Sequence, residues 1–146
     1  MPRVCRGRRA RRAQRGRVHR LHARADTGTR QMSRGGEEMT VRGLKEALDL
    51  SAFALPEGDR DVRGGYAGDL LSWVMGRARE GDAWLTIMSN ANIVAVATLA
   101  DVSCILLCEG VEPDKGVAGL AAEKGINLLG SGRSVFELSA LVKELL

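Results

Sequence analysis

The stretch AWLTIMSNANIVAVATLADVSCILLCEG, residues 83–110, decides the fold because it holds two short apolar runs around a longer, alanine-rich segment. The runs at residues 83–88 and 103–108 are nearly continuous, which is typical of strands covered on both faces. The segment between them, residues 90–101, fits a helix or a strand, and its length and alanine content favour a helix. A strand, a helix and a second strand in this order predict a βαβ unit with parallel strands.

The same alternation continues on both sides of this unit, with a third apolar run at residues 126–130. Thr40 is placed to cap the first helix, and Ser134 with Glu137 forms a capping box at the last one. The sequence therefore predicts the α/β class: a small three-layer domain with a mostly parallel sheet and helices on both faces. We expect helices over residues 40–50, 69–78, 90–101, 112–125 and 134–146, and strands over residues 52–55, 62–67, 83–88, 103–108 and 126–130.

Charge is distributed unevenly along the 146 residues. Residues 1–38 hold 12 of the 22 basic residues and 3 of the 18 acidic ones, a net charge of +9, whereas residues 39–146 have a net charge of −5. The first segment has few apolar residues and no periodicity, so it cannot bury enough surface to offset the entropy of ordering. We expect a disordered arginine-rich tail over residues 1–38 and one α/β domain over residues 39–146.

Two interpretations of the tail remain open. Arginine-rich segments bind nucleic acid by neutralising phosphates, so nucleic acid is a partner only if the tail is genuinely translated. The second interpretation, which the sequence favours, is a mis-assigned start, with the chain beginning at Met39. The two glycines and two glutamates before Met39 are compatible with the codons of a purine-rich ribosome-binding sequence.

Residues 39–146 carry no signal for a membrane, a metal or a cofactor. No apolar run approaches the roughly 18 residues of a membrane span, and no secretory signal is recognisable, which predicts a cytoplasmic protein. Cys104 and Cys108 would lie roughly 13 Å apart on one strand at about 3.3 Å per residue, too far for a disulfide. We expect both to be buried thiols, and we expect no metal site because the two histidines lie in the tail.

Polar residues and glycines follow the predicted strands, where parallel sheets bind their ligands. Because the carboxyl ends of parallel strands meet at one edge, we expect these loops to form a rim with free backbone amides, suited to a small anionic metabolite or a nucleotide. Simpler structural roles remain open: helix capping for Asp69, Asn90 and Asn92, and packing for Tyr66. The predicted ligand-binding residues are Gly64, Gly65, Tyr66, Asp69, Ser72, Ser89, Asn90, Asn92, Gly110 and Ser131.

Familiar catalytic patterns are absent from the sequence. No Gly-Lys pair occurs, which excludes the GxxxxGK[ST] phosphate loop, and GSGRSV has Val135 where a dinucleotide fingerprint has its third glycine. After residue 38 there is no histidine base and no recognisable nucleophile–base pair. These observations weigh against an enzyme, and we predict no catalytic residue.

Three motifs point to a family: GGYxxDLLS at residues 64–72, NIVAVA at residues 92–97, and GIxLL followed by SxFE within residues 125–137. With them, residues 41–146 resemble the stand-alone DRTGG-domain proteins of bacteria, which are related to the N-terminal domain of HPr kinase/phosphorylase. The resemblance implies a compact α/β regulatory module, often a homodimer, whose relatives occur beside CBS domains and sense ligands. The phosphate-loop kinase domain is missing, so the resemblance does not imply kinase activity.

Two departures from the family pattern concern the rim. Residues 107–110 stand where a Thr-Gly-Gly turn is expected, and Met88, Ser89 and Asn90 stand where many close relatives have Gln-Thr-His. If that histidine contacts a ligand in relatives, its absence changes or removes binding here. The sequence therefore predicts a non-catalytic, ligand-sensing module; the alternative is a structural or accessory subunit of a larger enzyme complex, held by a partner protein and without its own ligand.

Overall fold

The two apolar runs that decide the fold are the central strands β3 (Asp82–Thr86) and β4 (Cys104–Leu107) of a five-stranded sheet. This arrangement comes from a computed structural model, which describes residues 38–146. The predictions made for the arginine-rich tail lie outside the described residues.

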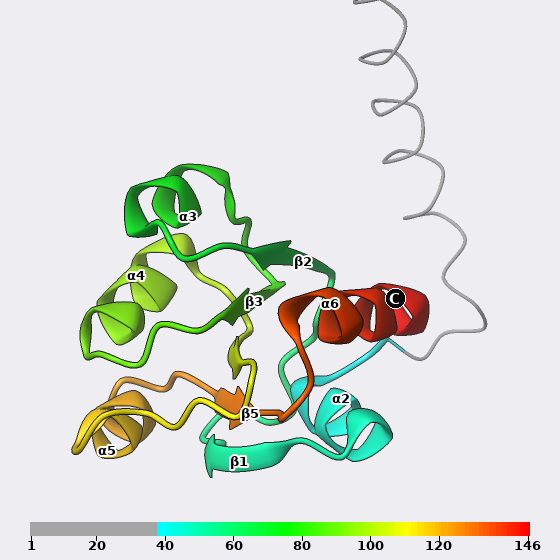
Figure 1. Ribbon diagram of the computed structural model, residues 1–146, viewed down its shortest axis with the longest axis horizontal. Coiled ribbons are helices and arrows are strands. Elements are labelled where there is room, and N and C mark those ends of the chain that lie inside the picture. Colours follow the sequence, from blue (N-terminus) through cyan, green and yellow to red (C-terminus); the bar gives the residue numbers. More distant parts are fainter. Residues whose placement is uncertain (1–37) are drawn as a thin grey trace, which may run out of the picture. The chain divides into compact units, whose positions relative to one another are not determined.

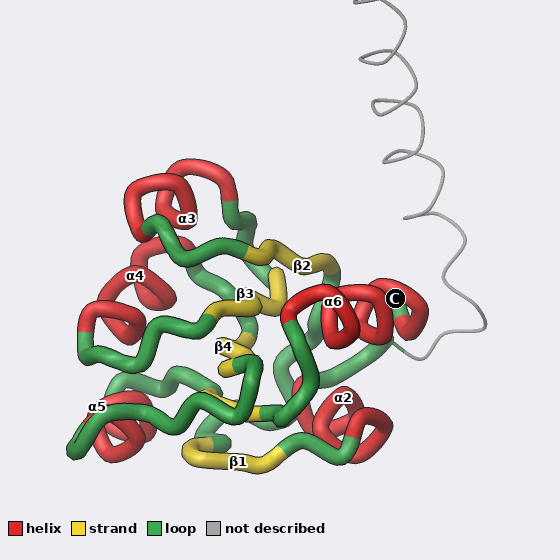
Figure 2. The backbone as a smooth tube through the Cα atoms, viewed as in Figure 1, coloured by secondary structure: helices red, strands yellow, loops and turns green. Residues whose placement is uncertain are grey.

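The sheet has the order β1-β5-β4-β3-β2. Strands β2 (Gly64–Ala67), β3, β4 and β5 (Leu128–Gly130) are parallel, and β1 (Ser51–Ala54) joins the edge of β5 in the antiparallel direction. The prediction of a mostly parallel sheet is confirmed. Figure 2 shows β4 between β3 and the lower strands, with loops joining each strand to the following helix.

Helices cover both faces of the sheet, as predicted. Figure 1 shows α3 (Leu71–Arg77), α4 (Asn92–Ala100) and α5 (Val117–Glu123) on one side, and α2 (Val41–Leu48) and α6 (Val135–Leu145) on the other. The ambiguous segment after β3 is a helix, because its alanines and valines pack against the sheet from one face.

Successive core residues along each strand pack on opposite faces of the sheet. Trp84, Ile105 and Leu107 pack on the α3–α5 side, whereas Leu85 and Leu106 pack on the α2–α6 side. Successive side chains of a strand point to opposite faces, so a strand covered by helices on both faces needs apolar residues at every position. This is the physical reason for the continuous apolar runs from which the strands were predicted.

Two of the predicted helix starts are confirmed by their caps. The hydroxyl of Thr40 accepts from the amide of Gly43 at 3.0 Å, and the hydroxyl of Ser134 accepts from the amide of Glu137 at 3.1 Å. The prediction that a helix starts at Asp69 is wrong, because α3 begins two residues later and its N-cap makes no side-chain hydrogen bond.

Cys104 and Cys108 are free, buried thiols, as expected from their spacing. Burial raises the pKa of Cys104 to about 12 and that of Cys108 to about 11. Between residues 38 and 146, no helix is long and apolar enough to cross a membrane.

Candidate functional site

The carboxyl ends of β2, β3, β4 and β5 lie at one edge of the sheet because these strands are parallel. Each strand leads there into a loop that ends at a helix: residues 68–70, 87–91, 108–116 and 131–134. We call these four loops the rim. The geometry confirms the shared edge for the loops that follow the four parallel strands, but not for Gly64 and Gly65, which lie within β2.

Asp69 joins the first two loops of the rim. Its Oδ1 accepts from the Thr86 hydroxyl at 2.7 Å and from the Ile87 amide at 3.0 Å. The Thr86 oxygen in turn accepts from the Met88 amide at 3.1 Å, and Thr86 is fully buried. Asp69 therefore does not cap a helix, as one interpretation had it, but fixes the end of β3 against the turn after β2.

The second loop is held by a bond within it and by bonds to the loop before α5. Asn90 closes the turn before α4, since its Oδ1 accepts from the Asn92 amide at 3.0 Å, whereas the N-cap residue Ala91 makes no side-chain hydrogen bond. The Ser89 hydroxyl donates to Oδ1 of Asp114 at 2.8 Å, and the Asp114 amide donates to the Ser89 carbonyl at 2.9 Å. The loop before α4 is thus tied to the loop before α5.

Backbone hydrogen bonds join the last two loops. The Gly110 amide donates to the Ser131 carbonyl at 2.9 Å, the Glu109 amide to the Arg133 carbonyl at 2.8 Å, and the Ser131 amide to the Leu107 carbonyl at 2.9 Å. The expectation that the rim presents free amides is wrong for Glu109, Gly110 and Ser131, because neighbouring loops use them. Gly110 has a φ of 72°, which suits glycine at this turn.

The two adjacent glycines, Gly64 and Gly65, do not lie at the rim. They belong to strand β2, inside the strand expected over residues 62–67, so their predicted place among the ligand-binding loops that follow the strands is wrong. Gly64 is paired with Asp82, the first residue of β3, and thus lies at the end of β2 away from the rim. A Cβ on Gly64 would lie 2.6 Å from Oδ1 of Asp82, so close approach explains this glycine.

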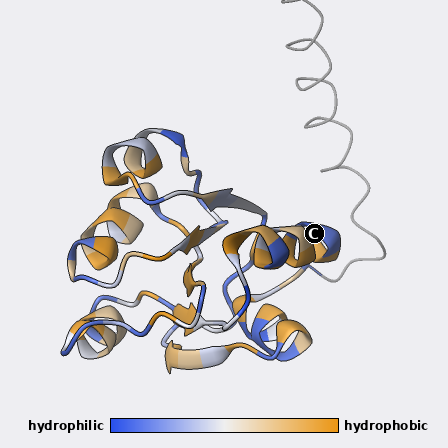
Figure 3. Ribbon diagram, viewed as in Figure 1, coloured by the Kyte–Doolittle hydropathy of each residue, from blue (hydrophilic) through white to orange (hydrophobic). Residues whose placement is uncertain are grey.

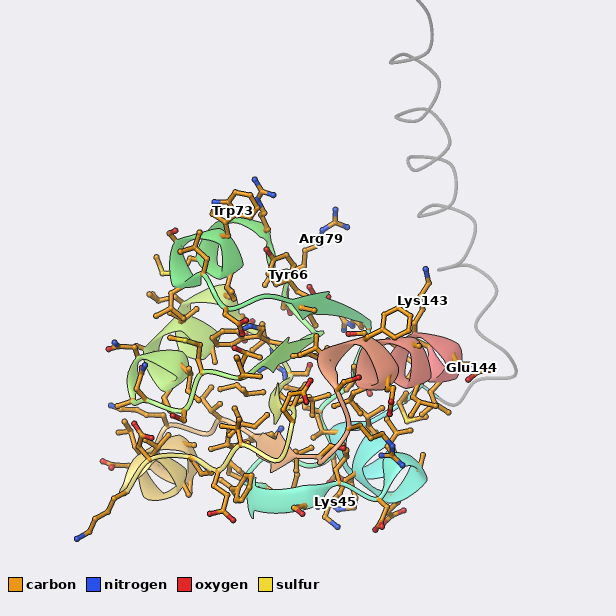
Figure 4. All side chains as sticks on the ribbon, in the orientation of Figure 1. Lys45, Tyr66, Trp73, Arg79, Lys143 and Glu144 are labelled. Carbon is orange, nitrogen blue, oxygen red and sulfur yellow. The ribbon has the colours of Figure 1, made fainter. Side chains whose placement is uncertain are left out.

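Tyr66 is half-buried and packs against the core on the α3–α5 side, with its ring against Gly68. The packing role is confirmed. Figure 4 shows Tyr66 near the same end of the molecule as Trp73, which projects outward from α3. Trp73 is stacked under the Arg77 guanidinium at 3.7 Å, and Trp84 donates from its indole nitrogen to the Gly68 carbonyl at 2.9 Å.

Several polar groups at the rim remain unpaired among the described residues. They come from the first two loops and the helices that follow, which pack together as α3 and α4. Asp69 keeps a second carboxylate oxygen, and the side chains of Ser72 and Asn92 are exposed. These groups offer a carboxylate, a hydroxyl and an amide.

The charges of the rim loops are predominantly acidic. Burial is the main cause of the raised pKa of Cys108, and the charges of Glu109 and Asp69 add to it. The one cation of the last loop, Arg133, donates to the carbonyl of Leu48 at 2.6 Å, at the C-terminus of α2. The charged residues of the rim loops are Asp69, Glu109, Glu112, Asp114, Lys115 and Arg133.

Comparisons with known proteins agree with this architecture. The sequence matches no protein-family model, and no curated protein matches it. Among solved structures, the chain is similar to the CBS and DRTGG domains of the regulatory region of Clostridium perfringens pyrophosphatase, in complex with its activator diadenosine tetraphosphate. The TM-score is 0.60 at 16% sequence identity, over 84% of this chain and 56% of that chain.

At this identity the likeness shows a shared fold. The fold is that of a region containing a DRTGG domain, which supports the resemblance seen in the sequence. The relation to the HPr kinase N-terminal domain stays a prediction. The chain matches about half of the length of that structure, so the activity of the whole pyrophosphatase is not transferred to it.

Sequence reasoning missed Thr86 and Asp114 as parts of the rim. Thr86 is the one hydroxyl residue in the apolar run of residues 83–88, and it stands at the last position of β3. A polar residue that ends a buried strand was the available signal. Asp114 was assigned only to the start of a helix, and its partner Ser89 is 25 residues away.

Proposed function

We propose that this protein is a non-catalytic regulatory module that binds a nucleotide at the rim. The proposal rests on one observation: Asp69, Ser72 and Asn92 present unpaired polar groups on two adjacent loops and helices. The Thr86 hydroxyl and the Ile87 amide both donate hydrogen bonds to Asp69, and these bonds hold the two loops together. Such a preorganised set suits recognition of a small polar molecule.

The charge of the rim limits the chemical class of ligand that can bind there. A bare anion would meet the carboxylates of Asp69 and Glu109, and in the last two loops the amides of Glu109, Gly110 and Ser131 are already bonded to neighbouring carbonyls. A carboxylate suits the hydroxyls of a ribose, as in dinucleotide-binding folds, and an amide suits a base edge. We therefore place the nucleoside end of the ligand at Asp69 and Asn92, with its phosphates directed outward towards solvent.

The structural neighbour supports a regulatory role. It is the regulatory region of an enzyme, and its activator is a nucleotide. The shared fold makes a regulatory module the natural proposal for this chain, whereas the identity of the ligand has to come from the rim itself.

A thermal-shift screen of the full chain tests the proposal with adenosine, AMP, ATP, diadenosine tetraphosphate and inorganic phosphate. At 100 times its Kd, a ligand stabilises the folded state by about 2.7 kcal/mol. We expect a nucleotide to do so and inorganic phosphate not to. If none of these compounds stabilises the chain, the proposal is contradicted and the second candidate function is favoured.

Two variants locate the site. Asp69→Asn keeps an acceptor oxygen for Thr86 but removes the charge, so we expect weaker nucleotide binding and a nearly unchanged fold. The matched control is Glu144→Gln, which removes an exposed carboxylate near the C-terminal end of α6, the end opposite the rim. If both variants bind the nucleotide with equal affinity, the ligand does not contact Asp69.

The second candidate is an accessory subunit without a ligand. It is favoured by the exposed apolar side chains of Leu70, Trp73, Met75 and Ile87, of which Trp73 is 51% exposed. Large exposed apolar residues close together in a chain are typical of protein interfaces. This candidate predicts a stable complex with a partner protein, lost in Trp73→Glu, and no response to nucleotides.

A further inference from the structure

Helix α4 is unusually apolar for a helix at the surface. None of its nine residues, Asn92–Ala100, is charged. One side packs into the core, whereas the opposite side exposes Ala95 and Leu99, and Leu99 is 74% exposed. A helix that is apolar all round is normally covered on all sides, and Figure 3 shows α4 mostly in hydrophobic colours. The exposed side of α4 is therefore a candidate binding surface.

A groove of about 380 Å³ runs beside this exposed side, between α4 and α5. Its walls include Val94, Ala95 and Leu99 from α4 and Leu120 from α5. Among the described residues, no aromatic side chain lines it, so the walls are aliphatic. Sites for small molecules usually have volumes of about 300–1,000 Å³ and mostly apolar walls with a few polar groups. The groove thus has the size and lining of a site for a small molecule with an alkyl body.

The groove is too small to be a protein interface by itself. Seven residues line it, whereas a stable protein–protein interface takes about 20–30 residues from each partner. The helices that form its walls, α4 and α5, have nine and seven residues. At about 1.5 Å per residue, they are roughly 10–13 Å long. A single alkyl chain is an occupant of suitable length.

One charged side chain borders the groove. Lys124 directly follows the last residue of α5, and its ammonium has no ion pair or hydrogen bond within residues 38–146. The last carbonyls of α5 do not hold it, because the backbone amides of residues 124–126 already donate to that helix. Its acidic neighbour Glu123 does not line the groove. Lys124 therefore places a free positive charge beside an apolar wall.

The other polar side chain of the groove is already used within α4. The Thr98 hydroxyl donates to the Val94 carbonyl at 2.8 Å, so its one proton is not available to a ligand. Of the described side chains that line the groove, Lys124 is then the one free hydrogen-bond donor. An aliphatic wall with one cation beside it is complementary to a molecule with an alkyl body and a single negatively charged end.

We propose that the α4–α5 groove binds a free alkyl carboxylate, with the alkyl chain along α4 and the carboxylate at the Lys124 ammonium. The chain covers apolar surface that is otherwise in contact with water, and this burial supplies most of the affinity. The ion pair is partly exposed, so it contributes less and fixes the direction of the ligand. Asp69, Ser72 and Asn92 do not line the groove, so this inference does not depend on nucleotide binding at the rim.

Isothermal titration calorimetry of the full chain tests the proposal with octanoate, octylammonium and acetate. Octylammonium has the same chain with the opposite charge, and acetate has the charge without the chain. We expect octanoate to bind at least about tenfold more tightly than acetate, because only octanoate buries a long alkyl chain. We expect it to bind at least about fivefold more tightly than octylammonium, because Lys124 attracts one and repels the other.

Two variants locate the ligand in the groove. Lys124→Met keeps the apolar stem and removes the charge, so the Kd for octanoate should rise about threefold to fivefold and the preference over octylammonium should disappear. Ala95→Glu places a carboxylate in the apolar wall and should raise the Kd at least about tenfold, while glutamate is well tolerated in a helix. The matched control is Lys143→Met in α6, on the opposite face of the sheet (Figure 1), which should change neither value.

Circular dichroism and thermal melting verify that each variant is folded. Three results would each overturn the proposal: no binding of octanoate by the wild type, a preference for octanoate that survives Lys124→Met, or an affinity for octanoate that Ala95→Glu leaves unchanged. The last result would show that octanoate binds to other exposed apolar side chains.

Discussion

Replacing Asp69 by alanine tests how the rim is built. The substitution removes the acceptor of two hydrogen bonds, from the Thr86 hydroxyl at 2.7 Å and from the Ile87 amide at 3.0 Å. The Thr86 side chain is fully buried, so water cannot replace its lost partner. The end of β3 and the turn after β2 would then lose their direct connection.

The expected loss of stability follows from these two bonds. A buried donor without a partner costs about 1–3 kcal/mol, and a bond to a carboxylate contributes more than one to a neutral group. Because Asp69 itself is exposed, we take the lower part of the range and expect Asp69→Ala to cost about 1–2 kcal/mol. For a domain of about 100 residues, each 1 kcal/mol lowers the Tm by about 4–8 °C.

A double-mutant cycle with Thr86→Val isolates the bond between the two side chains. Urea unfolding of the wild type, both single variants and the double variant should give a coupling free energy of about 1–2 kcal/mol. Asp69→Asn is the conservative control, since it keeps an oxygen for Thr86 and should cost less than about 1 kcal/mol. Additive single effects would refute the idea that this bond joins the two loops.

The structure also predicts whether two other changes, a glycine substitution and a rise in pH, raise or lower the stability. Gly130→Ala should lower stability by about 1–3 kcal/mol, because its Cβ would lie 2.6 Å from the Phe53 ring, whereas Gly119→Ala in α5 has open space and should gain about 0.5–1 kcal/mol; thermal melting of both checks this. Cys104 and Cys108 have raised pKa values in the folded state, so their stabilising contribution is complete below about pH 9 and is lost as the pH rises towards 11 and 12. Urea unfolding between those pH values should show a decrease of up to about 1.4 kcal/mol per pH unit per thiol, and a variant with both cysteines changed to alanine should show a flatter profile.

The layers and strand directions could be predicted because they depend on local patterns. The residues of β4 and β5 are apolar or glycine at every position, those of β3 are apolar between Asp82 and Thr86, and the helices between them carry their own caps or apolar stripes. Thr40 and Ser134 show this well, since each cap lies three residues from the amide it binds. Caps and apolar patterns of this kind depend on residues close together in the chain, so they can be recognised in a single sequence.

Pairings between distant residues could not be predicted in the same way. Asp69 and Thr86 are 17 residues apart, and their bond exists only because two parallel strands end side by side. Gly64 and Gly65 were predicted as ligand-binding residues because paired glycines usually mark a turn where the backbone is accessible. In the fold, Gly64 instead allows the backbone of an edge strand to approach Asp82.

The character of the rim shows why a local rule can mislead about a ligand. A helix N-terminus attracts anions through free amides, and four helices begin at this edge of the sheet. In α4, however, the amides of Asn92 and Ile93 are bonded to Asn90, and in α6 the amide of Glu137 is bonded to Ser134. These donors are thus already used in α4 and α6, whereas the N-caps of α3 and α5 make no side-chain hydrogen bond. The side chains that we propose as ligand contacts, Asp69, Ser72 and Asn92, are neutral or acidic, so a ligand held by them must offer hydroxyls or amines at the point of contact, and a nucleoside does.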